Sequence, residues 1–200
     1  SVLGAIRKVG YNAIITNDIS KIELADKLIL PGVGAFGDGM RNIQKLGLID
    51  PLNFLVNFKK IPILAICLGF QILSQKSSEF GTHKGLGWID STVDKLITKN
   101  KDLRVPHVGW NFIRAASDSS SPRLLHGIPV DQRIFYFANS YGVPFDSSTP
   151  SLHAFYRHES TWLGLVEQGS VFGVQFHPEK SRSQGLQVLR NFLVAAGMKG

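Results

Sequence analysis

Cysteine is scarce in this sequence: Cys67 is the only one among 200 residues. A single cysteine excludes an internal disulfide framework and a cysteine-rich zinc site. The absence of disulfides is typical of a reducing compartment, so we expect a cytoplasmic protein. A lone cysteine is most often a small buried apolar residue, so a reactive role for it has to be argued from its neighbours.

Long apolar runs and low-complexity tracts are also missing. No stretch of about eighteen apolar residues is present, so we expect no membrane-spanning helix. The first ten residues do not have the order of a signal peptide. With 44% hydrophobic and 18% charged residues, the composition is that of a globular protein. We therefore expect a single domain over residues 1–200.

Acidic residues are outnumbered, since 22 Lys and Arg against 15 Asp and Glu give a net charge of +7. Proteins that bind nucleic acids gather their basic residues on one face or stripe. Here the basic residues are scattered along the chain, so we expect no nucleic-acid partner. An acidic protein partner, or a phosphorylated substrate nearby, accounts for the charge equally well.

The hydrophobic pattern predicts an α/β fold. The first 80 residues alternate between strand-like and helix-like hydrophobic patterns, which favours a central, mostly parallel sheet flanked by helices. The second half predicts short strands, several of them antiparallel, folded onto the same sheet. We expect helices at 2–9, 21–25, 40–58 (with a break near Pro51), 70–77 and 183–197, strands at 12–16, 27–32, 61–69, 85–98, 104–116, 133–145 and 161–176, and a mobile loop at 116–122.

The stretch "PILAICLGFQIL" places Cys67 between a buried strand and a predicted helix. A strand–turn–helix of this kind holds a nucleophile on a sharp, crowded elbow, which needs small neighbours such as Ala65 and Gly69. A helix start also favours the thiolate over the thiol, and its first free N–H, from Leu68, can stabilise an oxyanion. These neighbours favour Cys67 as a nucleophile over a buried apolar residue.

The stretch "GVQFHPEKS" places His177 and Glu179 on either side of Pro178. A thiolate nucleophile needs an imidazole to carry protons, and His177 is the only one of six histidines that directly follows a buried-strand pattern. Pro178 keeps His177 extended, so that Glu179 can reach the same side and fix the imidazole tautomer. The alternatives are a pair of metal ligands, for which no third partner stands at a telling spacing, and a histidine at a strand end followed by a solvated glutamate.

A second glycine-rich turn, "LILPGVGAFGDGM", also follows a predicted strand. It matches neither common phosphate-binding fingerprint well, because it lacks the Lys-Ser/Thr ending. It could instead supply a second oxyanion N–H, from about Gly32 to Gly34, opposite the elbow. The remaining alternative is a tight turn before a helix.

Taken together, "PGVGAFGDGM", "AICLGFQIL", "GLGW", "VPHVGWN" and "GVQFHPEKS" resemble, in this order and spacing, the class I (triad-type) glutamine amidotransferases. The resemblance covers essentially the whole chain. It implies that Cys67 is the nucleophile, His177 the acid and base, and Glu179 the orienting carboxylate. It implies no cofactor and no metal. The other site residues that it implies are oxyanion donors at Leu68, Gly32 and Val33 and L-glutamine contacts at Gln71, Glu79, Asn139, Ser140 and Tyr141.

Within this family the chain looks most like the branch that serves histidine biosynthesis. That resemblance implies a heterodimer in which ammonia from glutamine passes to a (β/α)8-barrel cyclase, which makes imidazole glycerol phosphate and AICAR. The segments "VPHVGWN" and "HPEKS" would then lie near the docking face. A paralogue that supplies ammonia for bacterial surface-polysaccharide sugars is an alternative, toward which "HKGLGWI" and "VPHVGWN" lean somewhat. An inactive binding or scaffold protein is a second alternative.

The sequence departs from the family pattern in three places. Ala65 stands where the family usually has glycine, and "NSY" at 139–141 stands where "HSY" is common. Family members also open with a strand and a glycine-containing turn before the first helix, whereas this sequence begins inside that helix. The resemblance therefore implies that the family's first strand is missing from these 200 residues.

Overall fold

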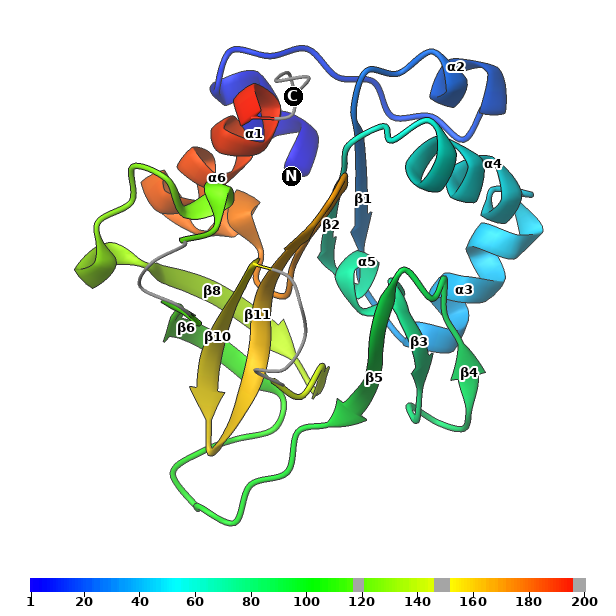
Figure 1. Cartoon of the computed structure of the whole chain (residues 1–200). Coiled ribbons are helices and arrows are strands. Elements are labelled where there is room, and N and C mark those ends of the chain that lie inside the picture. Colours follow the sequence, from blue (N-terminus) through cyan, green and yellow to red (C-terminus); the bar gives the residue numbers. More distant parts are fainter. Residues whose placement is uncertain (117–120, 146–151, 196–200) are drawn as a thin grey trace.

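The computed structural model describes residues 1–116, 121–145 and 152–195 (Figure 1). Its helices are α1 (Val2–Lys8), α2 (Ile19–Glu23), α3 (Phe36–Lys45), α4 (Ile49–Asn53), α5 (Leu68–Gln71) and α6 (Arg182–Ala195), with a π-helix at Phe54–Phe58 and 3-10 turns at Arg123–Leu125, Val130–Gln132 and Pro178–Lys180. Its strands are β1 (Leu28–Gly32), β2 (Ile63–Cys67), β3 (Ser74–Ser77), β4 (His83–Lys84), β5 (Ile89–Lys95), β6 (His107–Phe112), β7 (Arg114–Ala115), β8 (Ile134–Asn139), β9 (Tyr141–Gly142), β10 (Leu152–His158), β11 (Ser160–Gln168) and β12 (Val171–Val174).

The largest sheet has the strand order β1-β2-β12-β11-β10-β7. Strands β1, β2 and β12 run parallel, and the strands beyond β12 are paired antiparallel. This arrangement confirms the expected α/β fold with an antiparallel part on the same sheet. Within this sheet, the parallel pairing is confined to the three strands that lie around the elbow.

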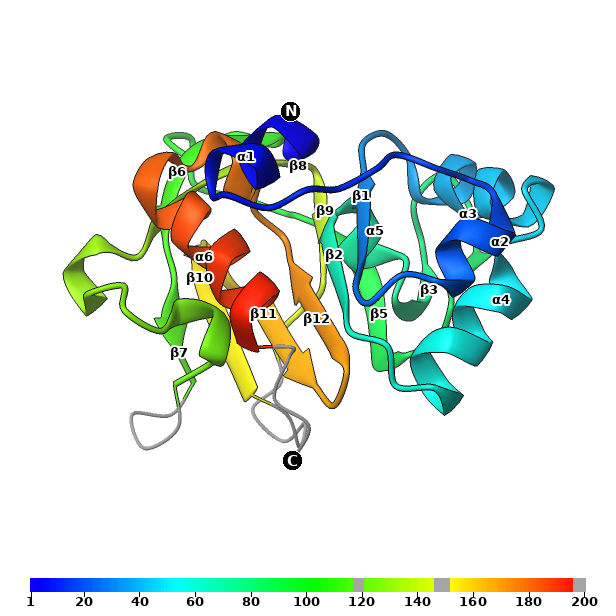
Figure 2. The same ribbon diagram turned by 90° about the horizontal axis from the view of Figure 1, so that it is seen from above.

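Strand β2 is buried along its whole length because helices cover both faces of the sheet (Figure 2). Leu64 and Ile66 pack into a core with α1 and α6, whereas Ile63 and Ala65 pack into a second core with α2, α3 and α4. Successive strand residues point to opposite faces, so a strand covered on both sides reads as a continuous apolar run. The expected doubly buried strand is confirmed.

Two smaller sheets complete the structure. Strands β4, β3, β5 and β9 form one, and the antiparallel pair β6–β8 forms the other. In the pair, Phe135 and Phe137 face the core, while Val108 and Trp110 are 60% and 44% exposed. This pair therefore has a buried inner face and an outer face that carries large apolar side chains.

Residues 12–16 form no strand, contrary to the sequence prediction. The segment runs along the surface, with Ile14 and Ile15 71% and 86% exposed. An isolated β-branched run does not hold strand geometry without a hydrogen-bonded neighbour. The pattern therefore predicted the local preference correctly and the structure wrongly.

Two predicted helices are also shorter or broken differently. The helix expected at 70–77 ends at Gln71, and Ser74–Ser77 is strand β3. The break expected near Pro51 lies at Gly47, whose φ is +67°, and Pro51 sits in the first turn of α4, where proline costs no hydrogen bond. Short amphipathic runs fit helix and strand alike, so tertiary pairing decides between them.

The turn that ends helix α1 matches the prediction. The helix stops just before Gly10, whose φ is +90°. The loop at 116–122 and the end of the last helix lie largely outside the described residues. Among the described residues, no helix has both the length and the apolar character needed to cross a membrane.

Candidate active site

Cys67 stands on a strained elbow at the end of β2. Its φ of 55° and ψ of −110° are unusual for a residue with a side chain, and such a conformation costs roughly 1–3 kcal/mol. The surrounding structure maintains it because β2 is wholly buried and α5 begins at the next residue. Helix α5 has only four residues, so its dipole contributes less to the thiolate than the predicted longer helix would.

Glycines make the elbow possible. A Cβ added to Gly69 would lie 1.9 Å from the backbone oxygen of Leu30, so α5 packs directly on β1. A Cβ on Gly173 would meet the Phe70 ring at 2.4 Å. Ala65, the smallest residue with a Cβ, is fully buried at the second of the two core faces. The departure from glycine at that position is therefore accommodated.

His177 and Glu179 form the predicted pair. The Nδ1 atom of His177 lies 2.9 Å from Oε1 of Glu179, and both side chains are 4% exposed. His177 is extended, with φ −98° and ψ 96°, as its position before proline predicts. Glu179 reaches the ring through the 3-10 turn at Pro178–Lys180, not through strand alternation as the sequence indicated.

Ser181 fixes the backbone of this pair. Its Oγ donates to the carbonyl oxygen of His177 at 2.6 Å and accepts from the N–H of Tyr136 at 2.9 Å. The His177 N–H donates to the carbonyl oxygen of Tyr136 at 2.9 Å. A Cβ on Gly185 would lie 1.9 Å from the Pro178 oxygen, so α6 also supports the turn. The imidazole is thus held from strand β8 and from helix α6.

The thiol and the imidazole meet because their strands are parallel neighbours. Cys67 ends β2, and His177 follows β12 by three residues, so both lie at the same carboxyl edge of the sheet. Cys67 is close enough to the imidazole to change its titration. Burial alone would lower the pKa of His177, but its interactions with Cys67 and with Glu179 raise that pKa to about 9.

Glu179 carries the charge opposite to that of the protonated His177 imidazole. Burial would raise the pKa of its carboxyl, but the hydrogen bond from His177 holds that pKa below its usual value. An ionised carboxylate beside a protonated imidazole fixes the ring orientation. The arrangement therefore keeps His177 protonated near pH 7, next to Cys67.

The glycine-rich turn lies directly beside the elbow. Gly32 is the register partner of Cys67 in the β1–β2 pair, and a Cβ on Gly32 would lie 3.0 Å from both the Gly69 nitrogen and the Leu68 side chain. Val33 is 79% exposed, and Gly34 has a φ of +101°. The backbone groups of Gly32, Val33 and Leu68 are therefore neighbours, as the sequence predicts for two sides of one oxyanion site.

Glu79 contacts the residues that follow the glycine-rich turn. Its Oε2 accepts a 2.7 Å hydrogen bond from the N–H of Phe36, the first residue of α3. A carboxylate satisfies a free N–H at a helix start and suits the helix dipole. Glu79 therefore fixes the position of α3 just after the PGVG turn.

The remaining predicted substrate contacts form one buried network. Gln71 donates from Nε2 to the carbonyl oxygen of Tyr141 at 2.8 Å, and Asn139 donates from Nδ2 to the same oxygen at 2.9 Å. The carbonyl oxygen of Ser140 accepts from the Leu96 N–H. Asn139 therefore has a clear structural role where the family commonly has histidine.

Three residues near the site were missed from the sequence. Gln175 donates from Nε2 to the Cys67 sulfur over 3.8 Å, and Ser181 locks the turn as described above. The hydroxyl of Tyr156 accepts from Asn139 at 3.1 Å. Burial raises the pKa of Tyr156, the Asn139 bond opposes this, and the nearby Cys67 charge adds to it. Only the position of Gln175, two residues before His177, offered a signal in the sequence.

A second buried imidazole, His107, is excluded as the proton carrier. Burial and the neighbouring His158, whose ring centroid is 4.4 Å away, lower the pKa of His107 to about 4. It stacks on Tyr156 at the inner face of β6. A ring held neutral in this way cannot supply a proton to a leaving group near pH 7.

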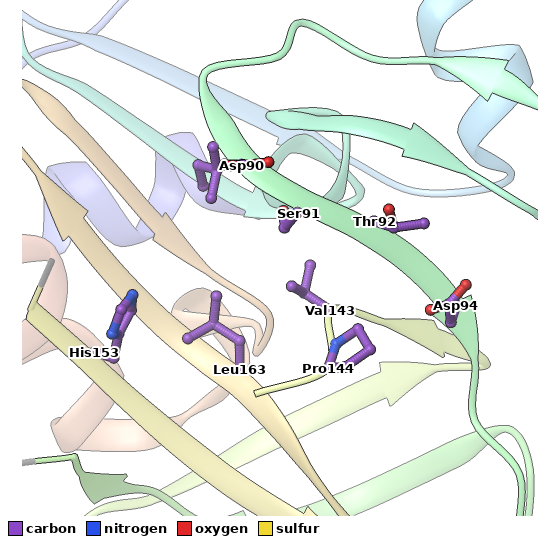
Figure 3. Close-up of a pocket in the computed structure, with 9 residues that line it drawn as sticks. Asp90, Ser91, Thr92, Asp94, Val143, Pro144, His153 and Leu163 are labelled. Atoms are coloured by element: carbon purple, nitrogen blue, oxygen red, sulfur yellow. The ribbon is translucent and has the colours of Figure 1, made fainter. Parts of the chain in front are cut away.

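A cavity of about 190 Å³ lies away from these residues, between β5 and the β10–β11 pair (Figure 3). Asp90, Ser91, Thr92 and Asp94 line one wall, and Val143, Pro144, His153 and Leu163 face them. None of the predicted site residues lines it. Among the described residues, no group of three or more His, Cys, Asp or Glu side chains could hold a metal ion.

Comparison with known proteins agrees with this geometry. The sequence family described as "Glutamine amidotransferase class-I" matches residues 2–196. The chain belongs to the class I glutamine amidotransferase family. This amidotransferase is 41% identical over 196 residues to "Imidazole glycerol phosphate synthase subunit HisH 2" of Methanococcus maripaludis, covering 98% of this chain and 94% of that one. It is 42% identical over 197 residues to the protein of the same name in Pseudomonas aeruginosa, with 96% and 92% covered.

Solved structures support the amidotransferase fold. One is the Trypanosoma brucei CTPS glutaminase domain with bound acivicin, with a TM-score of 0.64 and 16% identity over 98% of this chain and 86% of that one. Another is a glutamine amidotransferase from Thermotoga maritima, with a TM-score of 0.58 and 16% identity over 96% and 74% of the two chains. At this identity the likeness concerns the fold alone. The family match and the two relatives identify the chain as a HisH-like glutamine amidotransferase.

Proposed function

We propose that this amidotransferase hydrolyses L-glutamine through a thioester on Cys67 and passes the ammonia to a (β/α)8-barrel cyclase. The observation that carries the proposal is Cys67 on a strained, buried elbow, beside the hydrogen-bonded pair His177–Glu179. A nucleophile, a base and an orienting carboxylate in that order are the requirement for acyl transfer. We also propose that residues 1–200 form one domain, because both core clusters pack on the same sheet.

The first half of the reaction forms the thioester. The Cys67 thiolate attacks the side-chain amide carbon of glutamine, a C–S bond forms, and the carbonyl electrons move onto oxygen. When the tetrahedral intermediate collapses, the C–N bond breaks and protonated His177 gives its proton to the leaving nitrogen, which departs as ammonia. The raised pKa of about 9 keeps His177 protonated near pH 7, as this donor role requires.

The second half regenerates the thiolate. His177, now neutral, takes a proton from water as that water attacks the thioester carbon. The C–S bond then breaks, glutamate leaves, and the thiolate–imidazolium pair is restored. Glu179 stays ionised throughout and holds the ring, in agreement with its lowered pKa. Atoms balance as glutamine plus water giving glutamate plus ammonia.

The oxyanion of both intermediates is assigned to backbone N–H groups. Leu68 supplies one donor from the elbow, and the turn at Gly32–Val33 supplies the other. Each such donor is commonly worth about 3 kcal/mol in the transition state. The close approach of Gly32 to Leu68 supports the assignment, because the two donors have to converge on one oxygen.

Substrate binding is assigned to five residues around the same edge. Gln71, Asn139, Ser140 and Tyr141 belong to the buried network beside Cys67, and Glu79 stands across the PGVG turn. Glu79 offers a carboxylate of a kind that pairs with the α-ammonium group of glutamine. Because its Oε2 already accepts from Phe36, the other oxygen is the one available for substrate.

The docking surface for the cyclase is assigned to the outer face of the β6–β8 pair, defined here by Val108, Trp110, Ile134 and Tyr136. Arg182 lies over the Trp110 ring at 4.7 Å, and Lys180 lies over Tyr136 at 5.8 Å. Aromatic and arginine side chains are enriched at interface centres, and the two cations favour an acidic partner face. Because the Tyr136 carbonyl holds the His177 N–H, docking here can influence the imidazole.

The pathway assignment is histidine biosynthesis in the cytoplasm, with imidazole glycerol phosphate and AICAR as products of the cyclase. The names of the relatives support it, and the free thiol that the chemistry needs suits a reducing compartment. The names of the relatives outweigh the slight lean of "HKGLGWI" and "VPHVGWN" toward surface-sugar synthesis, and the Cys67, His177 and Glu179 set argues against an inactive scaffold. The proposal is that of an active glutaminase.

The experiment compares the wild-type chain with Cys67→Ala, each purified together with the protein it captures from its own organism. We expect the wild type to release glutamate and ammonia from glutamine, and the variant to bind the same partner without turnover. Capture of a barrel cyclase supports the histidine pathway, and capture of a sugar-modifying enzyme refutes it. Glutamine turnover by Cys67→Ala would falsify the nucleophile assignment, and no turnover by either protein in its complex would support the scaffold alternative.

A further inference from the structure

Gln175 is a fully buried side chain with no assigned role. It follows strand β12, two residues before His177, and is 0% exposed. Its Nε2 donates to the Cys67 sulfur over 3.8 Å, and its Oε1 accepts from Nε2 of Gln71 at 3.0 Å. Burying an amide is costly unless both ends are hydrogen-bonded. Both ends of Gln175 are bonded, and one of the partners is the proposed nucleophile.

The orientation of the Gln175 amide is fixed by the Tyr141 carbonyl, which acts through Gln71. The backbone carbonyl of Tyr141 accepts from Gln71 at 2.8 Å and from Asn139 at 2.9 Å, which uses both of its lone pairs. A carbonyl can only accept, so Gln71 has to turn its NH2 group toward Tyr141. The same NH2 group faces Gln175, so Gln175 has to present its oxygen to Gln71. The NH2 group of Gln175 is then the end that faces sulfur.

We propose that Gln175 is a catalytic residue that donates an N–H to the Cys67 thiolate, and that Gln71 is the positioning residue that prevents the Gln175 amide from flipping. This inference rests on Cys67 being the nucleophile of the proposed function. A thiolate accepts a hydrogen bond far more strongly than a neutral thiol or thioester sulfur does. The Gln175 N–H therefore stabilises the attacking form of Cys67 and holds its sulfur beside His177, and it interacts weakly with the acylated form.

One consequence concerns glutamine binding. Both N–H bonds of the Gln71 amide are directed at protein acceptors, the Tyr141 carbonyl and Gln175. The Oε1 atom is the part of Gln71 left to meet the substrate, so Gln71 can accept a hydrogen bond from glutamine but not donate one. A substrate N–H, and not a substrate carboxylate, is the group it recognises.

The test measures thiol reactivity without using glutamine. The only thiol of the chain belongs to Cys67, so alkylation by iodoacetamide, followed by intact mass, reports on that residue alone. In Gln175→Met the shape is kept and the donor is lost, and in Gln175→Glu an acceptor faces sulfur. We expect alkylation near pH 7 to slow about tenfold in Gln175→Met, with its pH profile moved to higher pH, and to slow further in Gln175→Glu.

The matched control is Gln187→Met. Gln187 lies on α6, is partly buried, and donates to Asn191 at 2.8 Å, so it loses one hydrogen bond at a place that is not in contact with Cys67. We expect its alkylation profile to match the wild type. A purely structural role for Gln175 would lower the melting temperature of Gln175→Met and leave the alkylation profile in place, and that result would overturn the proposal.

Gln71→Met tests the positioning step and keeps Gln175 itself. Without Gln71, the Gln175 amide is free to flip, so we expect an intermediate slowing of alkylation. A wild-type profile in folded Gln71→Met, judged by circular dichroism, would overturn the role of Gln71 even if the Gln175 variants do not fold. Because alkylation needs no glutamine, slowed alkylation of these variants combined with no glutamine turnover by the wild-type complex would reject the proposed function and the catalytic role of Gln175, and would leave only its hydrogen bond to the Cys67 thiolate standing.

Discussion

Gly69→Ala is the sharpest steric test of the elbow. The added Cβ would lie 1.9 Å from the Leu30 oxygen and 2.9 Å from its carbonyl carbon. Helix α5 and strand β1 would have to separate by about 1.5 Å to restore ordinary contact. Both groups are backbone, so neither can rotate away. The variant should therefore lose stability at the top of the usual range for overpacking, about 3 kcal/mol.

That loss can be measured by thermal unfolding followed by circular dichroism. For a chain of this size about 3 kcal/mol corresponds to a melting temperature lower by about 6–12 °C. Because the clash also displaces the turn after Cys67 by more than about 1 Å, glutamine turnover should fall by at least about 100-fold. The turnover assay uses the complex with the captured partner, as for Cys67→Ala.

The control is Gly4→Ala in helix α1. Gly4 is also a helical glycine, but an added Cβ there meets no atom within 4 Å. Helix propensity alone should make this variant more stable by up to about 1 kcal/mol. If Gly69→Ala melts at the wild-type temperature or above it, the close packing of α5 on β1 is refuted, and with it the account of why the elbow needs glycine.

Further predictions concern the imidazole, its support and the docking surface. Glu179→Gln should lower kcat by about 10³–10⁴-fold, measured as glutamate release across pH, because the imidazolium loses its charged partner; a kcat within about threefold of the wild-type value would contradict this. The pKa of His177 rises from 6.5 to about 9 on folding, so its stabilising effect is complete below pH 6.5 and lost as pH rises through about 9; the urea midpoint should fall over that interval, and less so in Glu179→Gln. Ser181→Ala removes two buried hydrogen bonds and should cost about 1–3 kcal/mol in urea unfolding, whereas an unchanged midpoint would show that the lock is dispensable. Trp110→Ala should weaken cyclase binding at least about tenfold in calorimetry and leave alkylation of Cys67 unchanged; undiminished binding would place the docking surface elsewhere.

The chemistry of the elbow was predictable because it is local. Cys67 sits at the end of a doubly buried strand, and the proline after His177 dictates an extended residue there, although the turn that carries Glu179 was not predicted. Covalent geometry and burial act over a few residues, so neighbouring residues in the sequence are enough to predict their effects. The meeting of Cys67 with His177 depends on the parallel pairing of β2 with β12, which the structure shows and the sequence analysis did not state.

The supporting contacts were not predictable in this way. Gln71 and Gln175 are 104 residues apart, and nothing in either neighbourhood indicates that their amides meet. The same holds for Ser181 and Tyr136, which are joined by the fold over 45 residues. Such contacts depend on how whole elements pack, and single-sequence periodicity does not carry that information.

The secondary-structure prediction was wrong where a strand-pairing partner decides the conformation. Ser74–Ser77 becomes a strand because it pairs with β5 and β4, although its sequence continues a helical pattern. Residues 12–16 have the composition of a strand, and Ile14 and Ile15 nevertheless remain exposed without one. In both places the local preference is weak, amounting to less than about 1 kcal/mol per residue, so the presence or absence of a pairing partner decides the structure.

The most direct measurement is the mass of the chain during turnover. The complex is mixed with L-glutamine, quenched in acid within the first turnovers, and digested for peptide mass analysis. The account requires one γ-glutamyl group, held by an alkali-labile bond on the peptide that contains Cys67, and no such adduct in Cys67→Ala. Ammonia release with the acyl group on another residue, or with no acylated peptide at any quench time, would contradict it.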